Sequence, residues 1–166
     1  MEIRAIKAED AGAMIVLTER LTEETTFMLF EPGERKVTEQ QQTRMIQSLI
    51  DDPDSCQFVV EEKGELLGFV VGRGGAADWG SHSVYCVIGI RQVATGRGLG
   101  KALMQKIITW ASGKDFIRME LTVMCHNQRA IKLYQSCGFE IEGTKTHSLK
   151  VNGVFVDEYL MARKLN

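Results

Sequence analysis

The 166-residue sequence has no apolar run long enough to cross a bilayer, and its first ten residues, MEIRAIKAED, carry charges where a secretory signal would be apolar. It has no excess of one charge either, because 20 Lys and Arg against 22 Asp and Glu leave a net charge of −2. Nucleic-acid-binding proteins normally show a basic excess or a basic stripe. We therefore expect a cytoplasmic protein with neither a membrane nor a nucleic acid as partner.

The four cysteines form no C-x-x-C pair, and three of them lie in apolar segments with a strand or helix pattern. This usage is typical of free, buried thiols in a reducing compartment. Cys125 and His126 are neighbours, but the spacing to other ligand-type residues does not fit a zinc site. The sequence therefore predicts no metal.

Hydrophobic periodicity and turn residues predict a mixed α/β chain. The expected strands are 2–6, 56–62, 66–72, 83–90, 117–124, 147–151 and 154–161, and the expected helices are 8–22, 39–50, 99–111 and 127–137. Lys63-Gly64 and Asn152-Gly153 mark hairpins. A helix between strands 83–90 and 117–124 predicts a parallel crossover pair, so we expect a mixed sheet with helices on both faces.

Residues 93–105, VATGRGLGKALMQ, place three glycines at the beginning of a predicted helix. Backbone N–H groups at this point have no partner inside the helix, and the helix dipole adds partial positive charge. Without side chains at Gly96, Gly98 and Gly100, several of these amides can approach a phosphate closely. Arg97 and Lys101 add charge. The segment is interpreted as a phosphate-binding loop, with a glycine-rich turn without ligand as the plain alternative.

Two common nucleotide-binding loops do not fit this segment. A Walker A loop needs a glycine where Thr95 stands and a hydroxyl residue where Ala102 stands, and a Rossmann loop needs a glycine in place of Lys101. Gly89 interrupts an otherwise apolar strand, which indicates a bulge or the close approach of another backbone or a ligand.

Two motifs resemble those of the GNAT family of N-acetyltransferases. TGRGLG (95–100) matches the last two glycines of the family's [Q/R]-x-x-G-x-[G/A] loop, with Thr95 in place of Arg or Gln, and Gln92 stands where proline is common. The second signature, N-x-x-A-[I/V]-x-L-Y-x-x-x-G-F, is matched at every defined position, by Asn127, Ala130, Ile131, Leu133, Tyr134, Gly138 and Phe139. The order of predicted elements also fits the family over nearly the whole chain.

The resemblance implies one N-acetyltransferase domain over residues 1–166. Its fold would be a mixed, mostly antiparallel sheet with one splayed parallel strand pair and helices on both faces. Its activity would be transfer of an acetyl group from acetyl-CoA to a primary amine, by direct attack in a ternary complex. Homodimers are frequent in the family, and the closing hairpin offers an edge for one, but the residues do not decide the oligomeric state.

The resemblance also assigns roles to individual residues. Those expected to bind the coenzyme are Ile88, Gly89, Ile90, Gly96, Arg97, Gly98, Leu99, Gly100, Lys101 and Asn127. Backbone groups of 88–90 would hydrogen-bond the pantetheine arm, and one N–H there would hold the thioester oxygen. Asn127 would cap its helix and contact the coenzyme. Tyr134 would protonate the leaving thiolate, the alternative being that its ring only packs in the core.

The acceptor and the base are left open by the residues. An alkylammonium stays charged near pH 7, so a base or a water chain must take its proton. The candidates considered are His82, Tyr85, Glu120 and His147. Acidic residues that would suit a cationic amine, such as a polyamine or a basic peptide, are Glu19, Glu23, Glu24, Glu31 and Glu34. Two rival functions are a non-catalytic acyl-CoA-binding or sensing module and a thiol enzyme using Cys125 beside His126.

Overall fold

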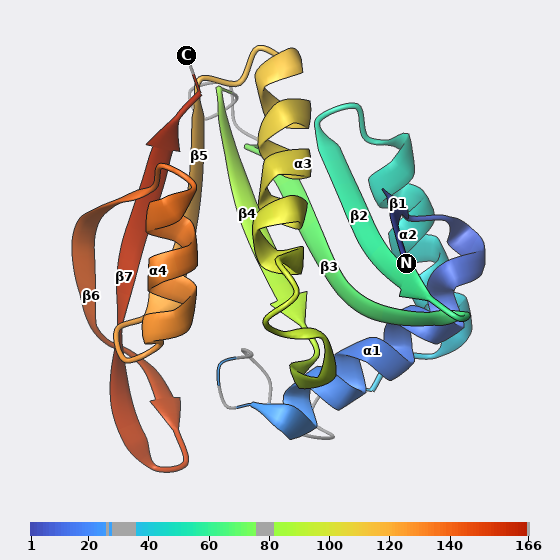
Figure 1. Ribbon diagram of the computed structural model, residues 1–166, viewed down its shortest axis with the longest axis horizontal. Helices are drawn as coiled ribbons and strands as arrows, with labels where there is room; N and C mark the ends of the chain where they lie inside the picture. The colour runs from blue at the N-terminus through green and yellow to red at the C-terminus, as the bar shows by residue number, and fades with distance from the viewer. Residues whose placement is uncertain (26, 28–35, 76–81, 166) are drawn as a thin grey trace.

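A seven-stranded sheet forms the centre of the computed structural model, which describes residues 1–25, 27, 36–75 and 82–165 (Figure 1). Its strand order is β1-β2-β3-β4-β5-β7-β6. The strands are β1 (Glu2–Ala5), β2 (Ser55–Glu62), β3 (Glu65–Gly74), β4 (Ser83–Ile90), β5 (Arg118–Met124), β6 (Glu140–Val151) and β7 (Val154–Lys164). Only β4 and β5 pair in parallel, and all other neighbours are antiparallel. This confirms the predicted mixed sheet.

Helices cover both faces of the sheet. They are α1 (Ala11–Glu24), α2 (Glu39–Asp51), α3 (Leu99–Gly113) and α4 (Gln128–Ser136), with short 3-10 turns at Ala8–Asp10 and Gln92–Ala94. Apolar residues of α1 and α2 share one buried core with Val59 and Phe69. Those of α3 and α4, in front in Figure 1, share a second core with Val60 and Val84. Alternate strand residues therefore bury their side chains under different helix pairs.

Local sequence explains where most of these elements begin and end. Lys63-Gly64 and Asn152-Gly153 have positive φ at both positions, as a type I′ hairpin turn requires, so the two predicted hairpins are confirmed. Thr38 begins α2 with a reciprocal capping box to Gln41. Gly138, at φ +90°, follows α4 in the left-handed conformation expected of a C′ residue.

The first predicted helix differs from the observed one at its beginning. Residues 8–10 form a 3-10 turn, and α1 runs from Ala11 to Glu24. The carboxylate of Asp10 accepts from the Lys7 N–H at 2.8 Å and makes two 2.8 Å bonds to Arg4. These bonds hold a tight turn between β1 and α1, so the regular helix starts after Asp10.

The parallel pair is joined over a short length only. Its paired residues are Ser83–Arg118, Val84–Met119 and Tyr85–Glu120, although both strands continue beyond them. Figure 1 shows β4 and β5 close together near the top and diverging toward the bottom. The predicted splayed pair is therefore confirmed, and the gap between β4 and β5 is called the seam below.

Candidate active site

The seam leaves backbone groups of β4 without a strand partner. The Ser83 carbonyl accepts from the Gly75 N–H and the Arg91 N–H donates to Leu67 O, both on the β3 side. The His82 carbonyl accepts from the Ile117 N–H on the β5 side. Successive residues of a strand direct their N–H and C=O groups to alternate sides. By this alternation Ile88 and Ile90 direct theirs toward β5, where the ladder has already ended. Two residues of a central strand therefore present free donors and acceptors to the seam.

The glycine loop lies directly after β4 and leads into α3. Gly96 and Gly98 have φ +78° and +76°, and a Cβ on either would meet no atom within 4 Å. The Ala102 N–H bonds to Gly98 O, so the amides of residues 99–101 have no acceptor inside the helix. The two glycines thus permit a left-handed turn that leaves the first amides of α3 open.

Two other glycines near the seam have packing reasons that the sequence did not reveal. A Cβ on Gly100 would lie 2.9 Å from Leu133 Cδ2, so this glycine lets α3 approach α4. A Cβ on Gly89 would lie 2.8 Å from the Phe69 ring and 2.9 Å from Leu21. The close approach expected at Gly89 is therefore made by side chains of β3 and α1.

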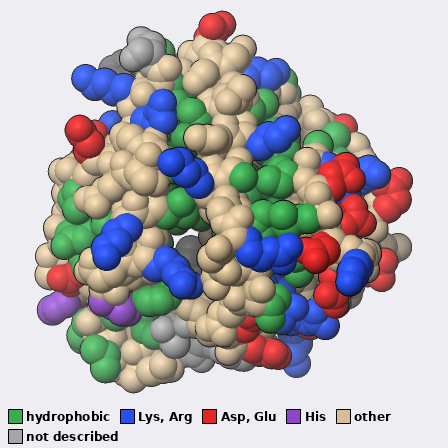
Figure 2. All heavy atoms as spheres, in the orientation of Figure 1, with side chains coloured by type: hydrophobic (Ala, Val, Ile, Leu, Met, Phe, Trp, Pro, Cys, Tyr) green, Lys and Arg blue, Asp and Glu red, His purple; other side chains and the backbone are tan. Residues whose placement is uncertain are grey.

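Cations gather on the face that carries α3 and α4, around a hollow between them (Figure 2). Lys101, in the first turn of α3, is exposed and makes no ion pair with a described residue. Arg97 is directed elsewhere, because its guanidinium bonds Glu62 Oε2 at 2.7 Å. That bond lowers the pKa of Glu62. Of the two predicted loop cations, Lys101 is the one left available to a phosphate.

The second motif supplies the wall opposite the glycine loop. Asn127 caps α4, with Oδ1 accepting from the Ala130 N–H at 3.3 Å, as predicted. About two turns after Asn127, Tyr134 lies on the buried side of α4. Its ring lies 6.1 Å from that of Phe139, and 7% of its surface is exposed. Its hydroxyl makes no hydrogen bond to a described residue.

Burial controls the chemistry of Tyr134. Removal from water disfavours the phenolate, so burial raises the pKa of Tyr134 well above its ordinary value. The same effect raises the pKa of the neighbouring Cys86 thiol to about 12. Both groups therefore stay protonated at neutral pH. Tyr134 is an unpartnered O–H donor, and Cys86 is not a thiolate.

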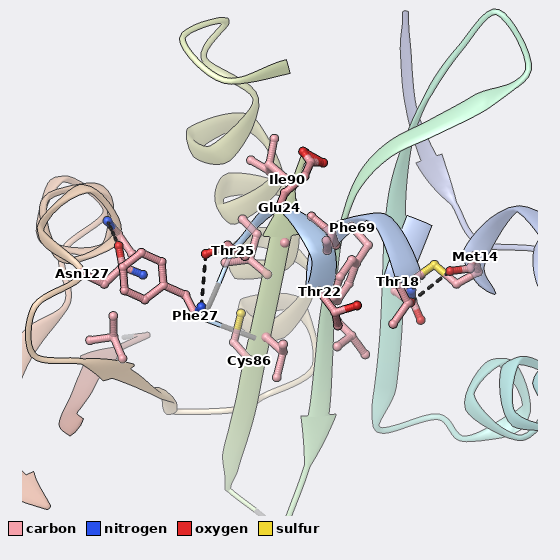
Figure 3. A pocket seen from close by; sticks show the side chains of 18 of the residues that line it. Met14, Thr18, Thr22, Glu24, Thr25, Phe27, Phe69, Cys86, Ile90 and Asn127 are labelled. Carbon is pink, nitrogen blue, oxygen red and sulfur yellow. Dashed lines mark hydrogen bonds between the residues drawn. The ribbon is translucent and has the colours of Figure 1, made fainter. Parts of the chain in front are cut away.

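A cavity of about 1040 Å³ lies at the seam and extends to Thr95, just before the glycines of the loop. On the α3–α4 side it is lined by Ile90, Asn127 and Tyr134, and on the other side by residues of α1 and β3. Figure 3 shows Asn127 at one end of the view, Thr18 and Met14 at the other, and Cys86 between them. The cavity thus reaches both faces of the sheet through the seam, and the two sides are called the donor side and the acceptor side below.

Comparison with known proteins decides what this arrangement belongs to. The family model described as the acetyltransferase (GNAT) family matches residues 18–139. The chain belongs to the GNAT family. An L-amino acid N-acetyltransferase, AaaT of Escherichia coli K12, is 37% identical over 117 residues, which are 69% of this chain and 72% of that protein. An uncharacterized N-acetyltransferase of Mycobacterium tuberculosis H37Rv is 30% identical over 70% of this chain and 71% of its own length.

Solved GNAT structures share the fold over nearly the full chain. An acetyltransferase of the GNAT family from Streptococcus pneumoniae has a TM-score of 0.94, with 25% identity and 99% of both chains covered. The acetyltransferase yncA of Salmonella typhimurium, solved with acetyl-CoA, has a TM-score of 0.89 at 20% identity, covering all of this chain and 94% of its own. The chain is thus an N-acetyltransferase whose acetyl donor is acetyl-CoA.

The residues of this GNAT chain fit that donor. Open amides at 99–101 with Lys101 beside them suit a diphosphate, and the free backbone groups of Ile88 and Ile90 suit the amides of a pantetheine arm. Among the described residues no group of three or more His, Cys, Asp and Glu could hold a metal ion. None of the described helices has the length and apolar character that crossing a membrane would require.

Glu24, at the end of α1, ties the acceptor side to the donor side. Its carboxylate accepts from Arg91 Nε and from the Gln92 N–H, both at 3.0 Å, and Gln92 Nε2 donates to its backbone carbonyl. From the sequence, Glu24 is expected among the acidic residues that would suit a cationic acceptor. In the structure its carboxylate instead pairs with Arg91, in the segment that leads into the glycine loop.

The other acidic residues of that group lie in two places. Glu19 and Glu23 are exposed on α1 and line the cavity. Glu31 and Glu34 lie outside the described residues. Three members of the acidic group thus line the cavity, and two of them, Glu19 and Glu23, are exposed.

A buried carboxylate that the sequence did not single out lines the acceptor side. Glu158, on β7, is 5% exposed, and it is the only charged side chain among the buried residues of the described part of the chain. Its Oε1 accepts from Ser148 Oγ at 2.9 Å and lies 3.9 Å from Lys145 Nζ. A register shift in β6 between Lys145 and Leu149 accompanies this contact.

The base candidates considered from sequence are engaged or remote. Tyr85 Oη bonds Thr122 Oγ1 at 2.7 Å across the seam, and Glu120 pairs with Arg118. The His147 ring stacks on Phe155 at 5.2 Å. His82 precedes β4, at the end of the strand away from the splay, and is absent from the cavity lining.

Cys125 and His126 do not form a thiol–imidazole pair. Burial raises the pKa of Cys125, with the Asp157 carboxylate adding to the effect. The His126 ring lies 5.1 Å from that of Phe27, which follows α1. The cysteine is thus protonated near neutral pH, and the contact with Phe27 brings the segment after α1 next to the segment before α4.

Proposed function

We propose that the chain transfers the acetyl group of acetyl-CoA to a primary amine by direct attack within a ternary complex. The observation that carries this proposal is a continuous cavity, which runs through the seam from the donor side to the acceptor side. A donor and an acceptor can therefore meet without a covalent enzyme intermediate. The thiols near the seam, Cys86 and Cys125, have raised pKa values and are poor nucleophiles.

Acetyl-CoA supplies a thioester whose C–S bond is exchanged for an amide bond to the amine nitrogen. An acceptor that arrives as an ammonium loses one proton before it attacks and a second when the amide forms, and the leaving sulfur gains one proton. The glycine loop and Lys101 hold the diphosphate. The free N–H groups of Ile88 and Ile90 supply donors at the seam, where a carbonyl oxygen that gains negative charge is stabilised by a fixed hydrogen bond. Asn127, besides capping α4, lines the same side.

Tyr134 is the proposed proton donor to sulfur. Tyr134 lines the cavity, and its hydroxyl has no hydrogen-bond partner among the described residues, so it can donate to a group that enters the seam. Its pKa is raised, which makes a phenol a weaker acid. Burial disfavours a thiolate in the same way, so the pKa of the CoA thiol is also raised in the seam. The leaving CoA thiolate therefore takes the proton readily.

Glu158 is the proposed acceptor of the amine's proton. Its carboxylate is buried, faces the cavity, and is held by Ser148, so it has a fixed position on the acceptor side. An ammonium near it is attracted before it is deprotonated. Transfer to the carboxylate, directly or through one water, would leave the neutral amine that attack requires.

The test separates binding from turnover. Calorimetric titration with acetyl-CoA and with CoA should show binding, and release of the CoA thiol should follow when a primary amine is added from a panel of amino acids, amino-acid amides, peptides and polyamines. Binding without acetylation of any amine would favour a non-catalytic acyl-CoA-binding module. Absence of binding by the folded protein would refute the donor site itself.

A further inference from the structure

The acceptor side of the cavity has a floor that stays partly exposed among the described residues. Val87, on central strand β4, is 37% exposed, while its neighbour Cys86, on the other face, is 2% exposed. Val87 lies directly opposite Val71 in the β3–β4 register, and both valines line the cavity. Apolar side chains in the middle of a sheet are normally buried on both faces when helices cover them, so this pair is a surface that an apolar ligand group would fill.

Apolar residues of the helices complete the walls above the two valines. Met14 and Ile15 of α1 line the cavity, and so does Met45 of α2, which is 39% exposed. Gln57 lies beneath α1 with its amide nitrogen 3.6 Å from Met14 Sδ. The floor and these walls of the chamber are thus apolar, so a charge of a polyamine that lay over them would lose its hydration.

Three basic residues of the described part of the chain line the cavity, Lys36, Arg73 and Arg129, and of these Arg73 lies on the sheet beside the two valines. Arg73 follows Val71 on the same face of β3, lies directly opposite Tyr85, and lines the cavity. Its guanidinium makes no hydrogen bond or ion pair to a described residue, although the Asp52 carboxylate is near enough to be affected by its charge. A free guanidinium beside an apolar floor is suited to a carboxylate, which it can bind through two parallel hydrogen bonds.

We infer that the acceptor is a free α-amino acid with an apolar side chain. Its side chain would lie over Val71 and Val87, its carboxylate would bind Arg73, and its amine would face the seam. This inference rests on the proposed function, because it names the acceptor of the same reaction. A peptide N-terminus has an amide where an amino acid has its carboxylate, and a polyamine has neither carboxylate nor apolar side chain, so both lack a group that the chamber selects.

The experiment compares each acid with its own amide. We expect kcat/KM of the wild type for L-phenylalanine, L-leucine and L-methionine to exceed that for the corresponding amides by about 10- to 100-fold, the range of a charge-assisted pair. Arg73→Gln should remove this preference by raising KM for the acids, with KM for acetyl-CoA unchanged, and Arg73→Lys should restore part of it. The matched control is Arg44→Gln, because Arg44 is an exposed arginine on α2 outside the cavity lining.

A second variant tests the floor without touching the charge. Val87→Thr keeps the shape of the side chain and adds a hydroxyl, so it should reduce the preference for leucine over serine as acceptor. Equal rates for acids and amides in the wild type would overturn the inference, as would an acid preference that survives in Arg73→Gln. Acetylation of spermidine or of peptides in place of amino acids would overturn it while leaving the proposed function intact. Failure to acetylate any amine would remove both.

Discussion

The role proposed for Tyr134 is tested most directly by removing its hydroxyl alone. Tyr134→Phe keeps the ring, which is 7% exposed and packs 6.1 Å from the Phe139 ring. The hydroxyl has no protein partner among the described residues, so the variant loses no hydrogen bond. The free energy of unfolding should therefore change by less than about 1 kcal/mol.

The effect on turnover should be much larger. A positioned general acid contributes about 10²- to 10⁴-fold, so kcat should fall by that factor, which corresponds to about 3–5 kcal/mol in the activation barrier. The assay is single-turnover acetyl transfer at saturating donor and acceptor, with Kd for acetyl-CoA measured in parallel. That Kd should stay unchanged, because the phenol acts on the sulfur after binding.

The pH profile gives an independent reading of the same group. Because burial raises the pKa of Tyr134, its proton is retained up to and beyond the ordinary phenol value of about 10. The wild type should thus show no loss of kcat from this group between about pH 7 and 10. Tyr159→Phe is the matched control, since Tyr159 is half-buried on β7 and does not line the cavity. Turnover within about threefold of wild type in a folded Tyr134→Phe protein would refute the acid role.

Four further changes test other parts of the site and fold. Glu158→Gln should lower kcat/KM for the amine by about 10²- to 10⁴-fold, measured by CoA release, because the buried carboxylate proposed to take the amine's proton is lost. Gly98→Ala should cost about 1–2 kcal/mol in thermal unfolding and weaken acetyl-CoA binding, because φ is +76° there. Glu24→Gln should raise Kd for acetyl-CoA and lower stability by about 1–2 kcal/mol, because a half-buried charged bond to Arg91 is lost. Arg4 lowers the pKa of Asp10, so the pair contributes stability that is complete above the unfolded value of about 3.9 and is lost as the pH falls below it. Asp10→Asn should therefore flatten the acid side of a plot of unfolding free energy against pH.

Matched variants decide whether these effects are local. Gly113→Ala adds a methyl group in open space at negative φ and should leave acetyl-CoA binding unchanged. Glu19→Gln removes an exposed carboxylate from α1 and should leave Kd for acetyl-CoA unchanged. Asp51→Asn removes an exposed carboxylate without a charged partner and should keep the wild-type acid slope. An Asp10→Asn protein whose unfolding free energy has the wild-type dependence on acid pH would contradict the proposed link between Asp10 and stability. A Glu158→Gln protein with normal kcat/KM would show that water, and not Glu158, takes the proton of the amine.

The sequence predicted the elements well because their signals are local. Asn152-Gly153 specifies its own turn, and Asn127 caps the helix that immediately follows it. The parallel pair followed from the helix between its two strands, since such a connection cannot be a hairpin. The beginning of α1 was misplaced, because the bonds of Asp10 to Arg4 and Lys7 depend on how β1 enters the sheet. The beginning of β6 was also misplaced, because the strand predicted at 147–151 starts at Glu140 and pairs with β7 there as well.

The parts that could not be predicted depend on contacts between distant segments. Glu24 bonds residues 67 and 68 positions away, and Arg97 turns to Glu62, 35 positions away. Nothing in the sequence around Glu158 distinguishes it from other charged residues of a hairpin strand, and only the tertiary structure buries it beside the cavity. Likewise, nothing local distinguishes the packing role of Gly100 from the turn roles of Gly96 and Gly98.

The short ladder between β4 and β5 divides the sheet mechanically. Strands β1 to β4 form one block and β5, β7 and β6 form another, and the backbone joins the blocks at three residue pairs near one end. Rotation of one block relative to the other is therefore easiest about residues 83–85 and 118–120, where the backbone joins the two blocks. A ligand that bridges the open end would add backbone hydrogen bonds between the blocks, and amide hydrogen exchange at Ile88 and Ile90 should slow when the donor binds.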